Sequence, residues 1–214
     1  MKDRTWEDHY TQRRAEVLYP DENLVRLLKK NLPPLPQFSL LAALDLGCGS
    51  GRHLKLLSDL GIKSFIGLDS SLNALLLSKK HSNCPLVLAD NRHIPLKDNS
   101  VGIVIAWGSL HYSIKKDLPL MLGEILRILA PDGQVFATLR SSRDTYLKKG
   151  RHLGNNTWMT DLSDITGSIV SFYDEDELAG AFSLFRKFTY GHMERTLMGD
   201  TAALISHWVV HAVK

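Results

Sequence analysis

A glycine-rich loop between an apolar run and a helical pattern constrains the fold of this chain more than any other segment. Residues 40–46 are mostly apolar, Gly47, Gly49 and Gly51 follow at alternate positions, and a helical pattern covers 53–60. Glycine has no Cβ atom, so such a loop can adopt positive φ and let a ligand lie against the backbone. The helix behind it offers unpaired N–H groups and the positive end of its dipole. This order of strand, glycine loop and helix predicts a site for a nucleotide-like ligand.

The spacing of these glycines argues against a dinucleotide. The fingerprint of NAD-binding proteins is G-x-G-x-x-G, whose third glycine packs the helix on the strand. Here Arg52 stands at the sixth position. A phosphate-binding loop would need Gly-Lys-Ser/Thr, and this does not follow Gly51.

An acidic residue follows the next apolar run. Residues 64–68 predict a second strand that ends at Asp69. A carboxylate at this place, one crossover helix after the glycine loop, can accept hydrogen bonds from both hydroxyls of a ribose. The alternative is that Asp69 caps the helix predicted at 72–80, although Ser70 and Ser71 offer other caps.

A third apolar run completes the pattern. Residues 85–89 predict a strand, and Asp90 follows it directly. Taken alone, Asp90 could be an ordinary turn residue. In open α/β sheets, however, ligands bind at the edge where the carboxyl ends of the parallel strands meet. The glycine loop, Asp69, Asp90 and the segment 107–112 are all expected at this edge.

These segments together resemble the class I S-adenosylmethionine (SAM)-dependent methyltransferases. Residues 44–51, LDLGCGSG, are similar to the first motif of that family, an acidic residue followed by G-x-G-x-G. Residues 94–100 and 126–133 resemble the family's approaches to its fourth and fifth strands. Two departures are Gly102, where the family usually has Asp, and Asp132 in place of the first glycine of a turn. Asp tolerates a left-handed turn, so the second change is mild.

The resemblance implies an α/β, Rossmann-like class I methyltransferase fold. Its sheet is seven-stranded and mostly parallel, with the order 3-2-1-4-5-7-6, the last strand antiparallel, and helices on both faces. The alternation of strands and amphipathic helices over 40–139 favours such a sheet with right-handed crossovers. The expected helices are 52–60, 72–81, 116–129 and 175–181, and the expected later strands are 101–107, 134–139, 185–195 and 205–213.

We expect a single domain over 1–214. An N-terminal helical arm, 1–36, ends in a proline-rich connector at 33–36, and an insert at 141–172 lies on the substrate side. A connection as long as this insert is usually functional or disordered.

SAM is the cofactor that the resemblance implies, with S-adenosylhomocysteine (SAH) as its product. Asp69 matches the ribose-binding acid of the family, Asp90 the residue that accepts from the adenine amino group, and Asn91 a residue whose backbone contacts the ring. The residues expected to hold the cofactor are Asp45, Gly47, Cys48, Gly49, Gly51, Asp69, Ser70, Asp90, Asn91 and Trp107.

Methyl transfer from SAM is a one-step displacement, so the protein mainly has to align the donor and the acceptor. A general base helps where the acceptor must lose a proton. His111 is the candidate base, because it follows the fourth strand and the usual pKa of histidine suits neutral pH; alternatively it caps a loop or a helix start. Tyr112 is expected to orient the acceptor or to line its pocket. Residues 107–110 lack the Asn/Asp-Pro-Pro-Tyr motif of family members that methylate adenine or glutamine.

Two regions are expected to shape the acceptor pocket. The arm carries Trp6, Tyr10, Arg13 and Arg14, and in many small-molecule methyltransferases such an arm covers the cofactor. The insert is rich in basic, amide and aromatic residues, which would suit an anionic acceptor such as a carboxylate or a phosphosugar. The alternative for both is a solvated segment without substrate contact. We therefore expect a small-molecule acceptor that is methylated on oxygen or nitrogen.

Other functions stay open as alternatives. A tRNA or protein methyltransferase is the first alternative. A net charge of +3 over 214 residues is too small to indicate nucleic acid by itself. The others are a SAM-binding partner subunit without catalysis and a nicotinamide-dependent oxidoreductase, which the glycine spacing and Asp90 disfavour.

Composition gives a simple expectation for location. No apolar run approaches the roughly 18 residues of a membrane span, and the N-terminus lacks the apolar core of a signal peptide. Two cysteines form no disulfide framework, so we expect a cytoplasmic protein with reduced thiols. No metal site is expected, since His207 and His211 fall in a predicted strand rather than on a helix. The oligomeric state does not follow from the sequence.

Overall fold

The computed structural model describes residues 5–32 and 41–214, and the predicted proline-rich connector at 33–36 lies outside them. The body of its sheet has the order β3-β2-β1-β4-β5-β10-β9, in which β1 to β5 are parallel and β10 is antiparallel to both β5 and β9. This confirms the predicted order of these seven strands and the antiparallel last strand. The sheet formed by the described residues has ten strands rather than the predicted seven, because three strands of the insert join it through β5. The strands are β1 Ala42–Leu46, β2 Phe65–Asp69, β3 Leu86–Leu88, β4 Val101–Ala106, β5 Leu129–Ser141, β9 Lys187–Leu197 and β10 Asp200–Val213.

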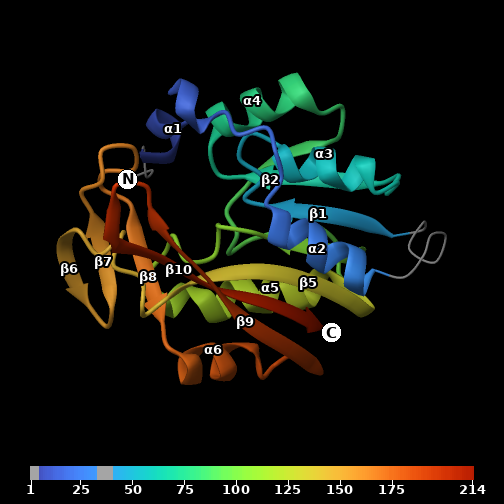
Figure 1. Ribbon diagram of the computed structural model, residues 1–214. Coiled ribbons are helices and arrows are strands. Elements are labelled where there is room, and N and C mark those ends of the chain that lie inside the picture. Colours follow the sequence, from blue (N-terminus) through green and yellow to red (C-terminus); the bar gives the residue numbers. More distant parts are fainter. Residues whose placement is uncertain (1–4, 33–40) are drawn as a thin grey trace.

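Helices cover both faces of this sheet (Figure 1). One face packs against α2, α3 and α4, and the other against α5 and α6. The short helix α1 lies at the carboxyl ends of the parallel strands. Their bounds are α1 Thr5–His9, α2 Glu22–Asn31, α3 Arg52–Asp59, α4 Leu72–His81, α5 Leu118–Ile128 and α6 Glu175–Phe182, with 3₁₀ turns at Arg13–Ala15 and Lys115–Asp117.

The central strands are apolar on both faces because each face is covered. Along β4, Val104 and Ala106 point into the core under α5 and α6, whereas Ile103 and Ile105 point into the core under α2 and α3. All four are at most 2% exposed. Parallel strands buried on both sides read as continuous apolar runs rather than alternating ones, and the sequence shows such runs.

Strand β5 is longer than predicted, since it begins at Leu129 rather than at 134. Leu129 already pairs with Val101, and the register then shifts before the pairing resumes at Gln134. Asp132 has φ +61° within this irregular stretch, as expected for the residue that replaces a turn glycine. Helix α5 in turn starts at Leu118, because a 3₁₀ turn occupies the preceding residues.

The insert is a small sheet, and this corrects the expectation of a long connection. It contains β6 Gly150–Gly154, β7 Thr157–Thr160 and β8 Ile169–Tyr173, joined antiparallel. Strand β8 then pairs parallel with the end of β5. The turn between β6 and β7 is Asn155-Asn156, both with positive φ, which is the signature of a two-residue hairpin. The β6–β7 hairpin projects on the same side of the molecule as α1 (Figure 1).

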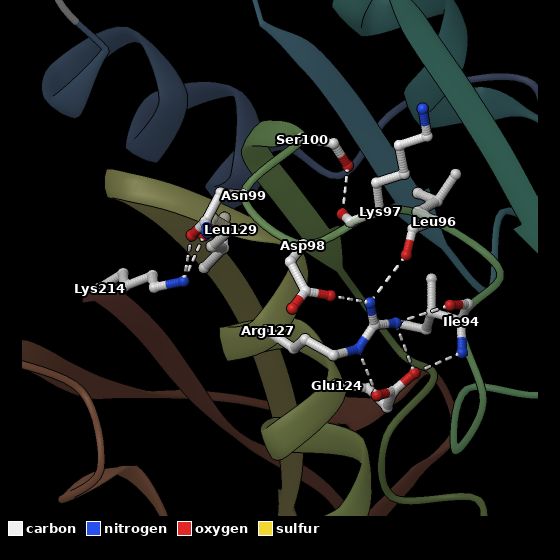
Figure 2. Close-up of polar contacts among 10 residues, drawn as sticks. All are labelled: Ile94, Leu96, Lys97, Asp98, Asn99, Ser100, Glu124, Arg127, Leu129 and Lys214. Atoms are coloured by element: carbon white, nitrogen blue, oxygen red, sulfur yellow. Dashed lines mark hydrogen bonds and ion pairs between the residues drawn. The ribbon is translucent and has the colours of Figure 1, made fainter.

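Arg127 of α5 holds the loop between β3 and β4 in place. Its guanidinium donates to the backbone carbonyls of Ile94 and Leu96 and to the carboxylates of Asp98 and Glu124, as Figure 2 shows. Glu124 also accepts from the backbone N–H of Ile94 at 2.8 Å. Since this loop continues from Asp90 and its neighbours, the network stabilises one end of the carboxyl edge.

None of the helices formed by the described residues has the length and apolarity that a membrane crossing requires.

Candidate active site

A cleft of about 1170 Å³ opens at the carboxyl ends of the parallel strands. Its walls come from the arm, from the ends of β1, β2 and β3, from the segment after β4, and from α5 and β8. The lining residues are Trp6, Glu7, Tyr10, Gly47, Asp69, Ser70, Leu88, Ala89, Asp90, Asn91, Arg92, Gly108, Ser109, Tyr112, Ser113, Ile114, Asp117, Met121 and Ile169.

The glycine loop contributes Gly47 to the wall of this cleft. The backbone N–H groups of Gly47 and Cys48 both donate to the carbonyl of Leu68, at 2.7 and 2.9 Å, which ties the loop to β2. Gly47 has φ +77°, and a Cβ atom there would lie 2.4 Å from the Cβ of Ser109. Gly47 is therefore required both by its backbone conformation and by the close approach of the segment after β4.

Asp69 lies at the end of β2 with 7% of its surface exposed. Its carboxylate accepts from the backbone N–H groups of Gly49 and Ser71, each at 2.9 Å. Burial raises the pKa of Asp69 to about 6, although these two N–H groups act in the opposite direction. Ser71, not Asp69, is the N-cap of α4. An ionised carboxylate has roughly four acceptor positions, so about two remain for a ligand.

Asp90 and Asn91 follow β3, next to the end of β2, where the backbone N–H of Ala89 donates to the carbonyl of Asp69 at 3.0 Å. The Asp90 carboxylate accepts from Nε and Nη2 of Arg92 at 2.8 and 2.6 Å. Nη1 of Arg92 donates to Asp117 at 2.9 Å. The Arg92 hydrogen bonds lower the pKa of Asp90, so this carboxylate is an ionised acceptor at neutral pH. The sequence motifs did not single out Arg92.

The N-terminal arm closes one side of the cleft. The Glu7 carboxylate accepts from the backbone N–H groups of Leu72 and Asn73 at 2.8 and 3.0 Å, at the start of α4. The ring of Trp6 meets that of Tyr112 edge-on, with 4.6 Å between centroids. Trp6 and Tyr10 thus line the cleft, as expected for the arm, whereas Glu7 had no signal in the sequence.

The predicted site residues divide into two groups. Those in the cleft wall are Gly47, Asp69, Ser70, Asp90, Asn91 and Tyr112, and those outside it are Asp45, Cys48, Gly49, Gly51, Trp107 and His111. The side chains of Asp45, Cys48 and Trp107 are buried within the protein. Asp45 is 3.6 Å from the ring of the buried His53. Contact of any of these residues with the cofactor stays a prediction.

His111 lies behind the cleft wall rather than in it. Its side chain is 1% exposed, its ring is 4.5 Å from that of Tyr112, and its Nδ1 is 3.4 Å from the carbonyl of Thr138. Burial, aided by the nearby Arg140, holds the pKa of His111 well below its usual value, so the imidazole is neutral. Its role as a base stays a prediction.

Residues 44–137 match the family described as a methyltransferase domain. This span runs from β1 through most of β5, and it includes the glycine loop, Asp69 and Asp90.

Two curated relatives and one solved structure place this match in context. The chain is 41% identical over 93 residues to a mitochondrial arginine-hydroxylase from Homo sapiens, covering 42% of this chain and 26% of that protein. It is 33% identical over 120 residues to a malonyl-[acyl-carrier protein] O-methyltransferase from Marinomonas sp., covering 53% and 43%. The chain therefore spans less than half of either relative. A SAM-dependent methyltransferase structure from Methanosarcina mazei has a TM-score of 0.64 at 18% identity, covering 86% of this chain and 98% of that one.

Proposed function

This chain belongs to the class I SAM-dependent methyltransferases, and we propose that it moves the methyl group of SAM to an oxygen or nitrogen of a small, anionic acceptor. The observation that carries the proposal is the meeting of Gly47, Asp69 and Asp90 in one cleft. These residues come from three strand ends that are well separated in the sequence. Their agreement with the family's cofactor residues supports SAM as the ligand.

The cleft has the chemistry that a nucleoside needs. Asp69 retains acceptor positions for ribose hydroxyls, and Asp90 for an adenine amino group. Leu88, the last residue of β3, is apolar but 51% exposed, and it lines the cleft. An apolar ligand face, such as that of adenine, would cover this surface.

When bound, SAM supplies a methyl group already activated on a positive sulfonium. The protein then has to hold the donor and the acceptor in line and to keep water away. Trp6 and Tyr112 close the cleft from opposite elements, which serves the second task. Alignment alone can lower the barrier by roughly 7–11 kcal/mol, so no catalytic triad is required.

Two features support an anionic acceptor. The insert, which contributes Ile169 to the cleft wall, carries Lys148, Lys149 and Arg151. One relative is named malonyl-[acyl-carrier protein] O-methyltransferase. An acidic substrate is attracted by such a cationic region at a distance.

Calorimetry with SAH tests the cofactor site directly. We expect Asp69→Ala to weaken SAH binding by about tenfold or more, because the loss of one charged hydrogen-bond partner costs about 1.5–3 kcal/mol. The matched control is Asp59→Ala, which removes an exposed carboxylate of α3 that pairs with Lys55. Equal SAH affinity in wild type and Asp69→Ala would refute the assignment.

A second experiment identifies the acceptor class. Labelled methyl groups from SAM are followed into the small-molecule, RNA and protein fractions of a lysate, with Asp69→Ala as the blank. Label in small acids supports the proposal. Label in RNA would favour a tRNA methyltransferase instead, for which the supporting observation is that Lys149 and Arg151, at the start of the projecting β6–β7 hairpin, are exposed. Label in protein would contradict the small acceptor.

A further inference from the structure

A group of basic side chains lies behind Tyr112 and is not used by the cofactor site. Arg140 is in β5, Arg195 in β9 and His207 in β10. We call these three residues the cationic cluster. The ring of His207 is 5.8 Å from that of His111, whose ring in turn lies against Tyr112 in the cleft wall. These two ring contacts connect the cluster to the part of the cleft wall that Tyr112 forms.

Strand pairing places the three side chains on the same face of the sheet. Arg140 is directly opposite His207 in the β5–β10 pair, and Arg195 is opposite Ile205 in the β9–β10 pair. Residues opposite each other, and residues two apart on a strand, share a face. Arg140 and Arg195 are both close enough to His207 to help lower its pKa to about 3, mainly an effect of burial, so this imidazole is neutral.

Several nitrogens of this region have no hydrogen-bond partner among the described residues. They are Nε of Arg140, Nδ1 of His207 and Nε2 of His111, all buried. Buried polar groups are nearly always hydrogen-bonded, so we expect three unpartnered nitrogens in one place to bind a ligand or water. Because Nδ1 of His111 faces the Thr138 carbonyl, its Nε2 is an acceptor. Nε of Arg140 is a donor, and Nδ1 of His207 is a donor in one of the two tautomers of its neutral ring.

The charge of the cluster is not balanced. Asp144 pairs with Nη1 of Arg140 at 2.6 Å and also accepts from the backbone N–H groups of Leu147 and Ser206. Arg195 forms no ion pair with any residue in the ranges that the structure describes. One positive charge therefore remains beside the unpartnered nitrogens.

We propose that Arg140, Arg195 and His207 bind a carboxylate of the methyl acceptor. This inference rests on the proposed function, because it takes the methyl acceptor to be a carboxylic acid. A carboxylate carries one negative charge, which matches the one uncompensated arginine. Its two oxygens can also accept hydrogen bonds from two parallel N–H groups of one guanidinium, which lie in the plane of that group. Nε2 of His111 is a hydrogen-bond acceptor, so it can accept from a hydroxyl group of the same ligand.

The experiment uses sodium malonate as a probe, with malonamide as the uncharged molecule of the same shape. Each is titrated by calorimetry into the full-length protein saturated with SAH, at constant ionic strength. We expect malonate to bind and malonamide not to bind. Arg195→Gln should weaken malonate binding by about tenfold, the effect of one charged hydrogen-bond partner. SAH affinity should not change in this variant, because Arg195 lies outside the cofactor cleft.

Two further variants make the test specific. Arg186→Gln removes another exposed arginine, paired with Asp132, and should bind malonate as wild type does. His207→Asn keeps a side-chain donor but loses the ring, and should weaken malonate without changing SAH binding. Equal binding of malonate and malonamide, absence of malonate binding, or no effect of Arg195→Gln would overturn the proposal.

The failure of this inference differs from the failure of the proposed function. SAH binding without malonate binding would refute the carboxylate subsite and leave the proposed cofactor site unaffected. If SAH does not bind, the proposed function fails. The malonate titration is then repeated without SAH, and absence of binding there also overturns the subsite.

Discussion

At the scale of single residues, we expect Asp69 to make cofactor binding depend on pH. Its pKa of about 6 is raised by burial, and only the ionised form can accept from two ribose hydroxyls. We therefore expect SAH affinity to be constant above pH 7 and to fall by about tenfold at pH 5, one unit below this pKa. Calorimetry at pH 7.5, 6.5, 5.5 and 5.0 measures the effect.

The matched variant is Asp69→Asn, which cannot ionise. Its SAH affinity should be weak at every pH, and its pH dependence should disappear. An unchanged slope in this variant would show that another group titrates.

His111 is the second residue whose role can be separated experimentally. It is buried outside the cofactor cleft, so His111→Gln should leave SAH affinity unchanged. If the neutral imidazole takes a proton from the methyl acceptor, turnover of His111→Gln should fall by roughly 10²-fold or more. Turnover and SAH affinity are measured on the same preparation. Full turnover in the variant would assign His111 a structural role beside the cationic cluster.

At the scale of elements, Arg127 joins α5 to the loop between β3 and β4. Its side chain is 31% exposed, and it donates to two carbonyls and two carboxylates. We expect Arg127→Met to lower the free energy of unfolding by about 1–2 kcal/mol, since each charged hydrogen bond contributes modestly where solvent competes. Denaturant unfolding gives this value. Arg26→Met is the control, because Arg26 forms an exposed ion pair within α2 and should change stability by less than about 0.5 kcal/mol.

The contact between α1 and α4 lies at one side of the cleft. Glu7 accepts from two N–H groups at the start of α4, and the charge suits the positive end of the helix dipole. Glu7→Gln keeps the shape and loses the charge, so we expect faster release of SAH, by roughly 3- to 10-fold. Stopped-flow fluorescence of Trp6 would follow the release. Glu22→Gln, on the exposed face of α2, should have no effect.

At the scale of the whole molecule, the buried histidines make stability depend on pH. The pKa of His207 is lowered to about 3 by burial, whereas it is about 6.5 in an unfolded chain. Between these values the unfolded state binds more protons, so stability rises with pH and is lost as the pH falls below 6.5. At pH 5 the loss should be about 1–2 kcal/mol.

Thermal unfolding at pH 7.5 and pH 5.0 measures this loss. His207→Gln cannot be protonated, so it should lose less stability than wild type between the two values. His152→Gln, on the exposed hairpin, should behave as wild type does. Asp69 acts in the opposite direction, since its raised pKa makes the folded state bind the extra proton between about pH 4 and 6.

Patterns within short segments predicted most of the core. The alternation of apolar runs and helical periods set the elements from β1 to α5, because burial of both sheet faces requires continuous apolar strands. The hairpin of the insert was missed although Asn155-Asn156 is a two-residue turn signal, because no strong apolar run flanks it on the side of β6.

Chain-local information was enough for some of the residues that follow strand ends, but not for Trp107 and His111, which are buried outside the cleft. Gly47, Asp69, Asp90 and Tyr112 were placed in the cleft from their positions after apolar runs, since parallel strands bring these ends together. The sequence alone could not place Glu7 on α4, Arg92 on Asp117, or Arg140 opposite His207. Those contacts join segments far apart in the chain, and only the packed sheet, with its register and its covered faces, decides which side chains meet.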